Sequence, residues 1–250
     1  MYPRLKKDRP WLALGASWAS FIALSIPYRH YAVDFTVADY LFNSEGNDWT
    51  LQHAWVTETL LHEGGRSFSE LLAFLAIGGL ITSFIRPSLR RWRRPLSYLV
   101  IAIAASTISI ATLKQLISMD CPWDLARYGG ELPFIGLFEM RPGNLPDSAC
   151  FPAGHASAGY AWLALYFLFK ATHPRWRWLG LAIGLAMGVA FGFAQQLRGA
   201  HFLSHDLWTL LICWTISALL ARALLPLPEP TVAVTRPLAH PLNSNARPSS

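Results

Sequence analysis

The sequence predicts an all-helical, polytopic membrane protein in which six transmembrane helices form one bundle. Three observations support this prediction. Hydrophobic residues make up 53% of the 250 residues and charged residues only 14%. The apolar residues gather in blocks of about the length that a helix needs to cross a bilayer, and lysine and arginine concentrate in alternate links between the blocks. We expect a single membrane domain over residues 11–226.

Six apolar blocks are the expected membrane spans, at residues 11–28, 68–85, 96–119, 156–172, 178–195 and 207–225. The fourth and fifth blocks are short, since a bilayer core requires about 20 apolar residues. A basic stretch precedes the first block, as it does in secretory signals. Pro27, Tyr28 and Arg29 end that block without a small-residue cleavage pattern, so we expect an uncleaved first helix.

The positive charges predict the orientation. They lie before the first span, in the second link and in the fourth link, at Arg4, Lys6, Lys7, Arg9, Arg86, Arg90, Arg91, Arg93, Arg94, Lys170, Arg175 and Arg177. Because such residues are retained in the cytoplasm, these links and both termini are expected there. The other links would face the periplasm of a bacterial inner membrane. The net charge of +6 is then a topology signal and indicates no nucleic-acid partner.

Composition separates the ends of the chain from the membrane domain. Residues 1–10 are expected to form a cytoplasmic N-terminus. Residues 227–250 are rich in Pro, Ser and Asn, have little to bury and read as a disordered cytoplasmic tail. Two of the three cysteines, Cys121 and Cys150, fall in the third link on the oxidising side, where a disulfide between them is favoured over two free or packed thiols. Cys213 falls inside the sixth span.

Reactive side chains gather near the outer ends of three spans. Lys114 lies about two turns inside the third span, where an ammonium needs either a phosphate partner or a stem that reaches the interface. His155 follows Pro-Ala-Gly at the start of the fourth span, and a helix start of this kind suits an anionic ligand. The link between the fifth and sixth spans holds Arg198, His201, His205 and Asp206 within nine residues. Chemistry is expected where these three segments meet.

These residues resemble the type-2 phosphatidate phosphatase superfamily of integral-membrane lipid phosphatases, which also includes vanadium haloperoxidases. The signature of that superfamily has three parts: Lys, six residues, then Arg-Pro; Pro-Ser-Gly-His; and Ser-Arg, five residues, His, three residues, Asp. Here Lys114 is followed after six residues by Cys121 and Pro122, the second part reads Pro-Ala-Gly-His up to His155, and Gly-Ala-His-Phe around His201 resembles the third. The resemblance covers roughly residues 60–225.

The chain departs from this signature, as a divergent branch would. Cys121 stands at the position of the first arginine, and Arg127 or Arg141 is the candidate replacement, with Arg127 favoured because it is nearer. Ala153 stands in place of the serine. Alignment on His201 puts Gln195 at the arginine of the third part, and Arg198 is its candidate substitute. The same alignment puts His205 at the aspartate position and Asp206 one residue later.

The resemblance implies hydrolysis of a phosphomonoester or diphosphate through a phosphohistidine, without a metal or other cofactor. It assigns His201 as the nucleophile and His155 as the general acid. Phosphate contacts would come from Lys114, Arg198, Arg127 and the backbone at Ala153 and Gly154. His205 or Asp206 would accept a hydrogen bond from His201 and hold its tautomer. Which of His201 and His205 attacks phosphorus stays open, with His201 favoured.

Other interpretations also remain open. His201, His205, Asp206 and His155 are alternatively the ligands of a metal ion in a metal-dependent hydrolase. Polar groups among six helices would also fit an anion transporter or channel. A phosphotransferase would use the same chemistry with a lipid hydroxyl as the acceptor. Residues 58–66, which include His62, would either help to select the substrate or, as we favour, form a polar loop that turns on two glycines. Phosphatidic acid, phosphatidylglycerol phosphate, undecaprenyl pyrophosphate and a lipid A phosphate all fit, and the oligomeric state is open.

Overall fold

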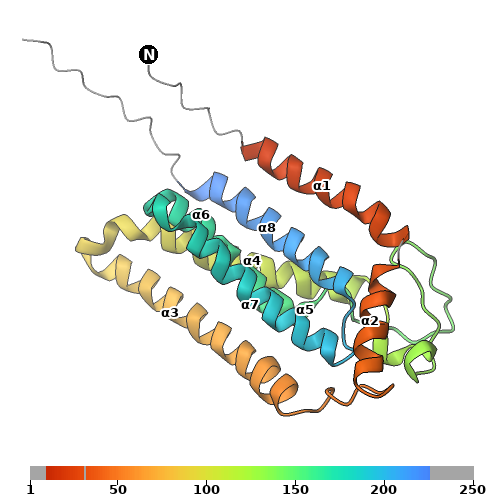
Figure 1. The fold of residues 1–250 in the computed structure, drawn as a ribbon. Coiled ribbons are helices and arrows are strands. Elements are labelled where there is room, and N and C mark those ends of the chain that lie inside the picture. Colours follow the sequence, from red (N-terminus) through yellow and green to blue (C-terminus); the bar gives the residue numbers. More distant parts are fainter. Residues whose placement is uncertain (1–9, 31, 226–250) are drawn as a thin grey trace, which may run out of the picture.

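The computed structural model describes residues 10–30 and 32–225, and all regular secondary structure in them is helical. The α-helices are α1 (Pro10–His30), α2 (Val33–Ser44), α3 (Gly65–Ile85), α4 (Arg93–Leu116), α5 (Gly154–Tyr160), α6 (Ala164–Thr172), α7 (Arg177–Leu197) and α8 (Leu203–Leu224) (Figure 1). The shorter elements are η1 (Val56–Gly64), η2 (Pro87–Trp92), η3 (Pro122–Asp124), η4 (Ala126–Tyr128), η5 (Ala161–Leu163) and η6 (Pro174–Trp176), of which η1 is π-helical and the others are 3₁₀ turns. The predictions for residues 1–9 and 227–250 concern parts of the chain outside the described residues.

Four helical segments of the described chain are long and apolar enough to cross a membrane: Val56–Ile85, Pro87–Leu116, Pro174–Leu197 and Leu203–Leu224. They contain most of the second, third, fifth and sixth expected spans, and the second begins 12 residues earlier than expected, at Val56 instead of residue 68. The first and fourth expected spans are also helical, as α1 and as α5 to α6, but they are not among these four. The chain is therefore an all-helical, multi-pass membrane protein with four candidate spans by length and composition.

The fourth expected span forms the middle of the bundle. It is broken into α5, η5 and α6, and Ala161, Leu163 and Ala164 have no exposed surface. These elements pack against α4, α7 and α8. Glycines at positions 180, 184 and 188 of α7 allow its backbone to approach the α5 to α6 segment closely. A Cβ at Gly184 would lie 2.5 Å from the backbone nitrogen of Leu163. Small residues permit this kind of close helix contact in membrane bundles.

Two features of the N-terminal half differ from expectation. The polar segment at residues 58–66 is not a loop, because η1 runs directly into α3 and both belong to one long helix. Gly65 serves helix packing instead of a turn: a Cβ there would lie 2.6 Å from the Phe191 ring of α7. Helix α2, which the sequence does not predict, packs against α1, α7 and α8.

Helix α1 lies along α8 at one edge of the bundle, where Trp18 Nε1 donates to Thr215 Oγ1 at 3.0 Å.

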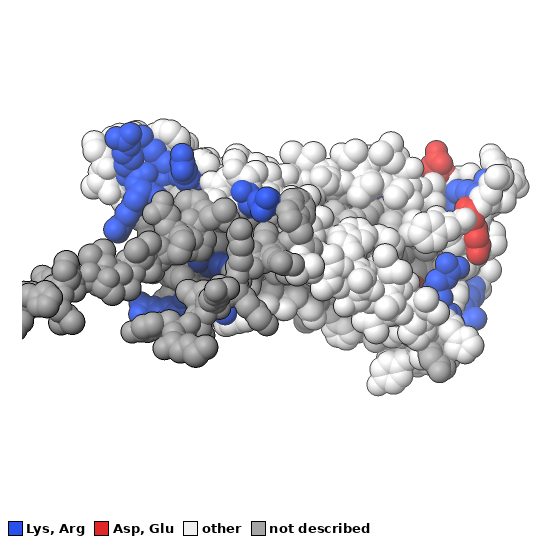
Figure 2. Space-filling model, turned by 90° about the horizontal axis from the view of Figure 1, so that it is seen from above, with Lys and Arg blue, Asp and Glu red and all other residues white. Residues whose placement is uncertain are grey.

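Charged residues separate between the two ends of the molecule. Figure 2 shows lysine and arginine gathered at one end, on the side of the α3 to α4 link seen in Figure 1. The acidic residues visible in this view lie at the other end, together with a few basic ones. This separation agrees with the alternation of charge along the sequence. The predicted orientation, with the arginine-rich end in the cytoplasm, stays a prediction.

Candidate active site

The end of the bundle opposite the α3 to α4 link collects the ionisable groups that the sequence singles out. The end of α4 supplies Lys114, the start of α5 supplies His155, and the turn before α8 supplies His201. All three are electrostatic neighbours, since the charges of Lys114 and His155 both act on the His201 ring. Groups far apart in the chain thus share one site.

Lys114 lies in the last turn of α4 and is half-buried. Its stem and ammonium lie over the start of α5: a Cβ at Gly154 would be 3.0 Å from Lys114 Cδ and 3.3 Å from Nζ. Among the described residues, Lys114 has no ion-pair partner. A cation held this way against a helix start is suited to bind an anion that the protein itself does not supply.

The turn before α5 is held on α8 by its backbone. The carbonyl of Ala153 accepts from Thr209 Oγ1 at 3.1 Å, and its N–H donates to the carbonyl of His205 at 3.4 Å. Ala153 itself is fully buried. One residue further on, His155 Nε2 donates to the carbonyl of Leu61 in η1 at 3.2 Å. The His155 ring is therefore fixed between η1 and the bundle core.

His201, just before α8, and His205, in the first turn of α8, face each other through their Nδ1 atoms, which are 3.5 Å apart. His205 is fully buried, and its ring packs edge-on against Phe151 and Phe202. In such a pair one Nδ1 donates and the other accepts. If His201 is the donor, its Nε2 keeps a free lone pair, as an attack on phosphorus requires.

The environment of His201 favours its neutral form. Burial lowers the pKa of His201 well below the ordinary value of 6.5, and the neighbouring His205 and Lys114 lower it further. Burial disfavours a charged imidazole because water no longer solvates it, and a nearby ammonium repels the added proton. A neutral imidazole at pH 7 is the nucleophilic form.

Asp206 follows His205 directly but lies in a different environment. Its Oδ2 accepts a hydrogen bond from Gln196 Nε2, and its carboxylate lies against Gly192 of α7. Its Oδ1 is buried and has no hydrogen-bond partner in the described part of the chain. Between the two candidate acceptors for His201, the geometry therefore favours His205.

Arg198 ends α7 and is almost entirely buried. Its guanidinium makes three contacts: Nε donates to the carbonyl of Gln52 at 2.7 Å, Nη2 to Glu58 Oε1 at 3.3 Å and Nη1 to Gln195 Oε1 at 3.4 Å. The last contact brings the guanidinium next to Gln195, the residue that occupies the arginine position of the signature. Arg198 also lies close enough to His155 to act on it electrostatically.

The other two arginines considered for the site are bound to carboxylates. Arg127 is half-exposed and forms a bidentate pair with Asp39 of α2, at 2.6 and 2.8 Å. This pair lowers the pKa of Asp39 and raises that of Arg127. Arg141 pairs in the same way with buried Asp120, at 2.7 and 2.8 Å. Both guanidinium groups are therefore paired with carboxylates, and sequence spacing does not reveal these acidic partners.

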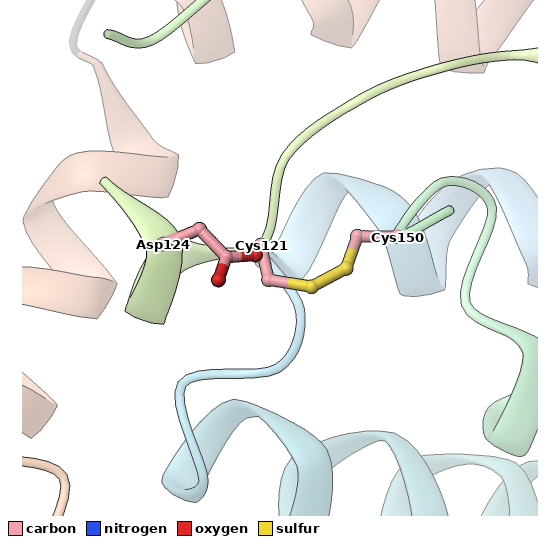
Figure 3. Close-up of side chains that lie close together, drawn as sticks. All are labelled: Cys121, Asp124 and Cys150. Carbon is pink, nitrogen blue, oxygen red and sulfur yellow. A yellow bond between two sulfur atoms is a disulfide. The ribbon is translucent and has the colours of Figure 1, made fainter. Parts of the chain in front are cut away.

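The link between α4 and α5 ties the parts of the site together. Cys121 and Cys150 form a disulfide with Cα atoms 5.3 Å apart (Figure 3). The N–H of Trp123 donates to the carbonyl of Gly199 at 2.9 Å, which joins the same link to the turn before α8. The carboxylate of Asp124 lies within 4.8 Å of both sulfur atoms. Because the sulfurs are bonded to each other, they cannot act as thiolate ligands for a metal.

His62 is a further member of this cluster; the sequence offers substrate selection by its segment only as the less favoured interpretation, beside a polar loop. Its ring centre lies 4.3 Å from that of His155, and its Nδ1 accepts from Gln195 Nε2 at 2.9 Å. The two glycines that follow His62 favour a loop in the sequence, although the segment is a helix that faces the site. The available signal is that Val56, Leu60 and Leu61 are apolar at helical spacing directly before the glycines.

Comparison with known proteins identifies the membrane domain. A family model described as the PAP2 superfamily matches residues 95–227. This range contains Lys114, His155 and His201, although α1 to α3 lie outside it. No curated protein matches the chain, and no solved structure does.

Proposed function

The chain belongs to the PAP2 superfamily, the type-2 phosphatidic acid phosphatases, and on this premise we propose that it is a membrane lipid phosphatase acting through a phosphohistidine. Membership indicates a phosphatase that acts on phosphate esters in a membrane. The proposal adds a lipid phosphomonoester or diphosphate as the substrate, His201 as the nucleophile and independence from metals.

The observation that carries the proposal is the meeting of Lys114, His155 and His201 at one end of the bundle. Each comes from a different part of the signature, and His201 is buried beside the other two. An imidazole, a second histidine and a lysine are the groups that in-line phosphoryl transfer needs for attack, proton transfer and charge stabilisation. Their position at the end of membrane helices suits a phosphate at headgroup level with its lipid tail in the bilayer.

The reaction proceeds in two steps. His201 Nε2 attacks phosphorus, the bond from phosphorus to the lipid oxygen breaks, and protonated His155 gives its Nδ1 proton to that oxygen while its Nε2–H stays on the Leu61 carbonyl. Water then attacks the phosphohistidine and returns a proton to His155, the bond from nitrogen to phosphorus breaks, and inorganic phosphate leaves. Lys114 and the backbone N–H groups at Gly154 stabilise the negative charge on the phosphoryl oxygens.

The contacts of His205 and Arg198 suggest how each assists these three residues. His205 accepts from His201 and holds its tautomer, because their Nδ1 atoms face each other. Arg198 has three contacts to the protein and two N–H groups beyond them, so it can hold η1 in place and still contact a phosphate. We assign no phosphate contact to Arg127 or Arg141, whose guanidinium groups pair with Asp39 and Asp120.

A phosphotransferase that passes the phosphoryl group to a lipid hydroxyl remains the second candidate, since the first step would be the same. The metal-dependent alternative is less well supported. Among the described residues, one group of metal-ligand residue types lies close together, Cys121, Asp124 and Cys150, but its two sulfurs are bonded to each other and it includes none of the histidines. We further propose that the site faces the periplasm of a bacterial inner membrane, as the charge separation in Figure 2 favours.

The test is phosphate release by purified protein from phosphatidic acid, phosphatidylglycerol phosphate, undecaprenyl pyrophosphate and a lipid A phosphate, with EDTA present. We expect turnover of at least one lipid by the wild type and none by His201→Ala. Acid-labile phosphate bound to the His155→Ala variant would identify the phosphohistidine. Full turnover by His201→Ala would overturn the assigned nucleophile, and loss of wild-type activity in EDTA would favour the metal-dependent alternative.

A further inference from the structure

The π-helical segment η1 places two consecutive residues against the site. The carbonyl of Leu61 accepts from His155 Nε2 at 3.2 Å, and the ring of His62 lies 4.3 Å from the same histidine. π-helical turns are rare and occur often at functional sites, because they shift side chains relative to a regular helix. The mechanism above uses His155 but gives no role to His62, which is half-buried beside it.

The protonation of His62 follows from its partners. Arg198 Nη1 donates to Gln195 Oε1, which identifies the other end of that amide as the donor. Gln195 Nε2 then donates to His62 Nδ1 at 2.9 Å. A neutral histidine whose Nδ1 accepts a hydrogen bond carries its proton on Nε2. The chain of contacts from Arg198 through Gln195 therefore makes His62 Nε2 a hydrogen-bond donor.

The neighbouring histidine lacks this free donor. In the structure, His155 Nε2 donates to a backbone carbonyl, so its proton on that nitrogen is already engaged. The two arginine positions of the signature hold Cys121 and Gln195, which bring no positive charge to the phosphate. Arg127 and Arg141 are paired with carboxylates. An additional hydrogen-bond donor next to His155 would offset the absence of these two arginine side chains.

We infer that His62 is a substrate-contacting residue of this site and that its Nε2 donates a hydrogen bond to a phosphate oxygen of the substrate. The inference rests on the proposed phosphatase function and extends it. Gln195 is then a positioning residue, which acts on the substrate only through His62. The segment at residues 56–64 thereby takes part in phosphate recognition.

The test compares purified full-length His62→Ala, His62→Gln, Gln195→Ala and His201→Ala with the wild type. His53→Ala is the matched control, because this histidine also precedes α3 but its side chain is 76% exposed. Two quantities are measured for each variant: kcat/KM with the lipid that the wild type hydrolyses, and the inhibition constant of orthovanadate, a small mimic of the phosphate. Melting temperatures identify folded variants.

For His62→Ala we expect a loss of roughly 10- to 100-fold in kcat/KM, the usual effect of removing one hydrogen bond to a charged group or developing charge. Orthovanadate inhibition should weaken with it. His62→Gln should recover part of both, because its amide can donate, and Gln195→Ala should have a smaller effect than His62→Ala. His53→Ala should match the wild type.

The outcomes separate the two proposals. A wild type that is active, with an inactive His201→Ala and a folded His62→Ala that matches the wild type in both measurements, would overturn the inference and leave the proposed function standing. A wild type that is inactive on every lipid and does not bind orthovanadate would overturn both.

Discussion

The Nδ1 atoms of His201 and His205 lie 3.5 Å apart, one on the turn before α8 and the other in the first turn of that helix. This contact puts a neutral imidazole where the family signature has an aspartate. An imidazole can accept a hydrogen bond from the Nδ1–H of His201 without bringing a negative charge into a fully buried position. Asp206, the adjacent carboxylate, is instead hydrogen-bonded to Gln196.

His205→Ala should lower kcat strongly, by roughly 10²- to 10⁴-fold, because His201 then loses the group that holds its tautomer. His205→Asp should keep more activity than His205→Ala, since an aspartate also accepts from Nδ1. Asp206→Asn should change kcat much less than either. Steady-state kinetics on the three folded variants would measure this order. A large loss in Asp206→Asn together with full activity in His205→Ala would show that Asp206 orients the nucleophile.

The activity should persist into mildly acidic pH. Burial lowers the pKa of His201 well below 6.5, and the neutral form that attacks is present above that pKa and lost as the pH falls through it. The acid limb of kcat/KM against pH should therefore lie below pH 6.5. Lys114→Gln removes a positive charge that lowers the pKa of His201, so its residual activity should have an acid limb at higher pH. A wild-type acid limb above pH 6.5 would contradict this account of His201.

Reduction should loosen the site. The disulfide between Cys121 and Cys150 closes a loop with a sequence separation of 29 residues and connects the end of α4 to the start of α5. Replacing both cysteines by serine should reduce the free energy of unfolding by up to about 3 to 4 kcal/mol, on the chain-entropy estimate. Melting temperatures with and without dithiothreitol measure the effect. The double serine variant should not respond to dithiothreitol, and equal melting temperatures for both proteins would count against a stabilising bond.

The close approach of α7 to η5 should be sensitive to a single methyl group. Gly184→Ala places a Cβ against the backbone of Leu163, which cannot move aside as a side chain would, so we expect a loss of about 1 to 3 kcal/mol. Gly78→Ala is the control, because a Cβ at Gly78 in α3 would meet nothing within 4 Å. That change should be neutral or stabilising by up to about 1 kcal/mol. Thermal unfolding in detergent distinguishes the two, and similar melting temperatures would show that α7 can shift.

Much of the site follows from order and spacing along the chain. The apolar blocks predict helices, and their alternating direction brings the ends that carry Lys114, His155 and His201 to one side. The separation of four residues near the start of the last span predicts that His201 and His205 are neighbours, and they are in contact although α8 begins only at Leu203. These relationships are local or depend only on the number of crossings, so residue pattern and spacing suffice to predict them.

The remaining features depend on contacts between distant residues. Arg127 is nearer in sequence to Lys114 than Arg141 is, yet its partner Asp39 lies 88 residues away and no local pattern connects them. His205 and Asp206 are adjacent, but successive residues point in different directions on a helix, and the packing of α8 decides which one faces His201. The sequence pattern at Gly64 and Gly65 favours a turn, whereas in the structure Gly65 packs against Phe191 of α7 and His62 lies beside His155. Hydrophobic pattern predicts which segments are helical, whereas side-chain pairing is decided by how the helices pack.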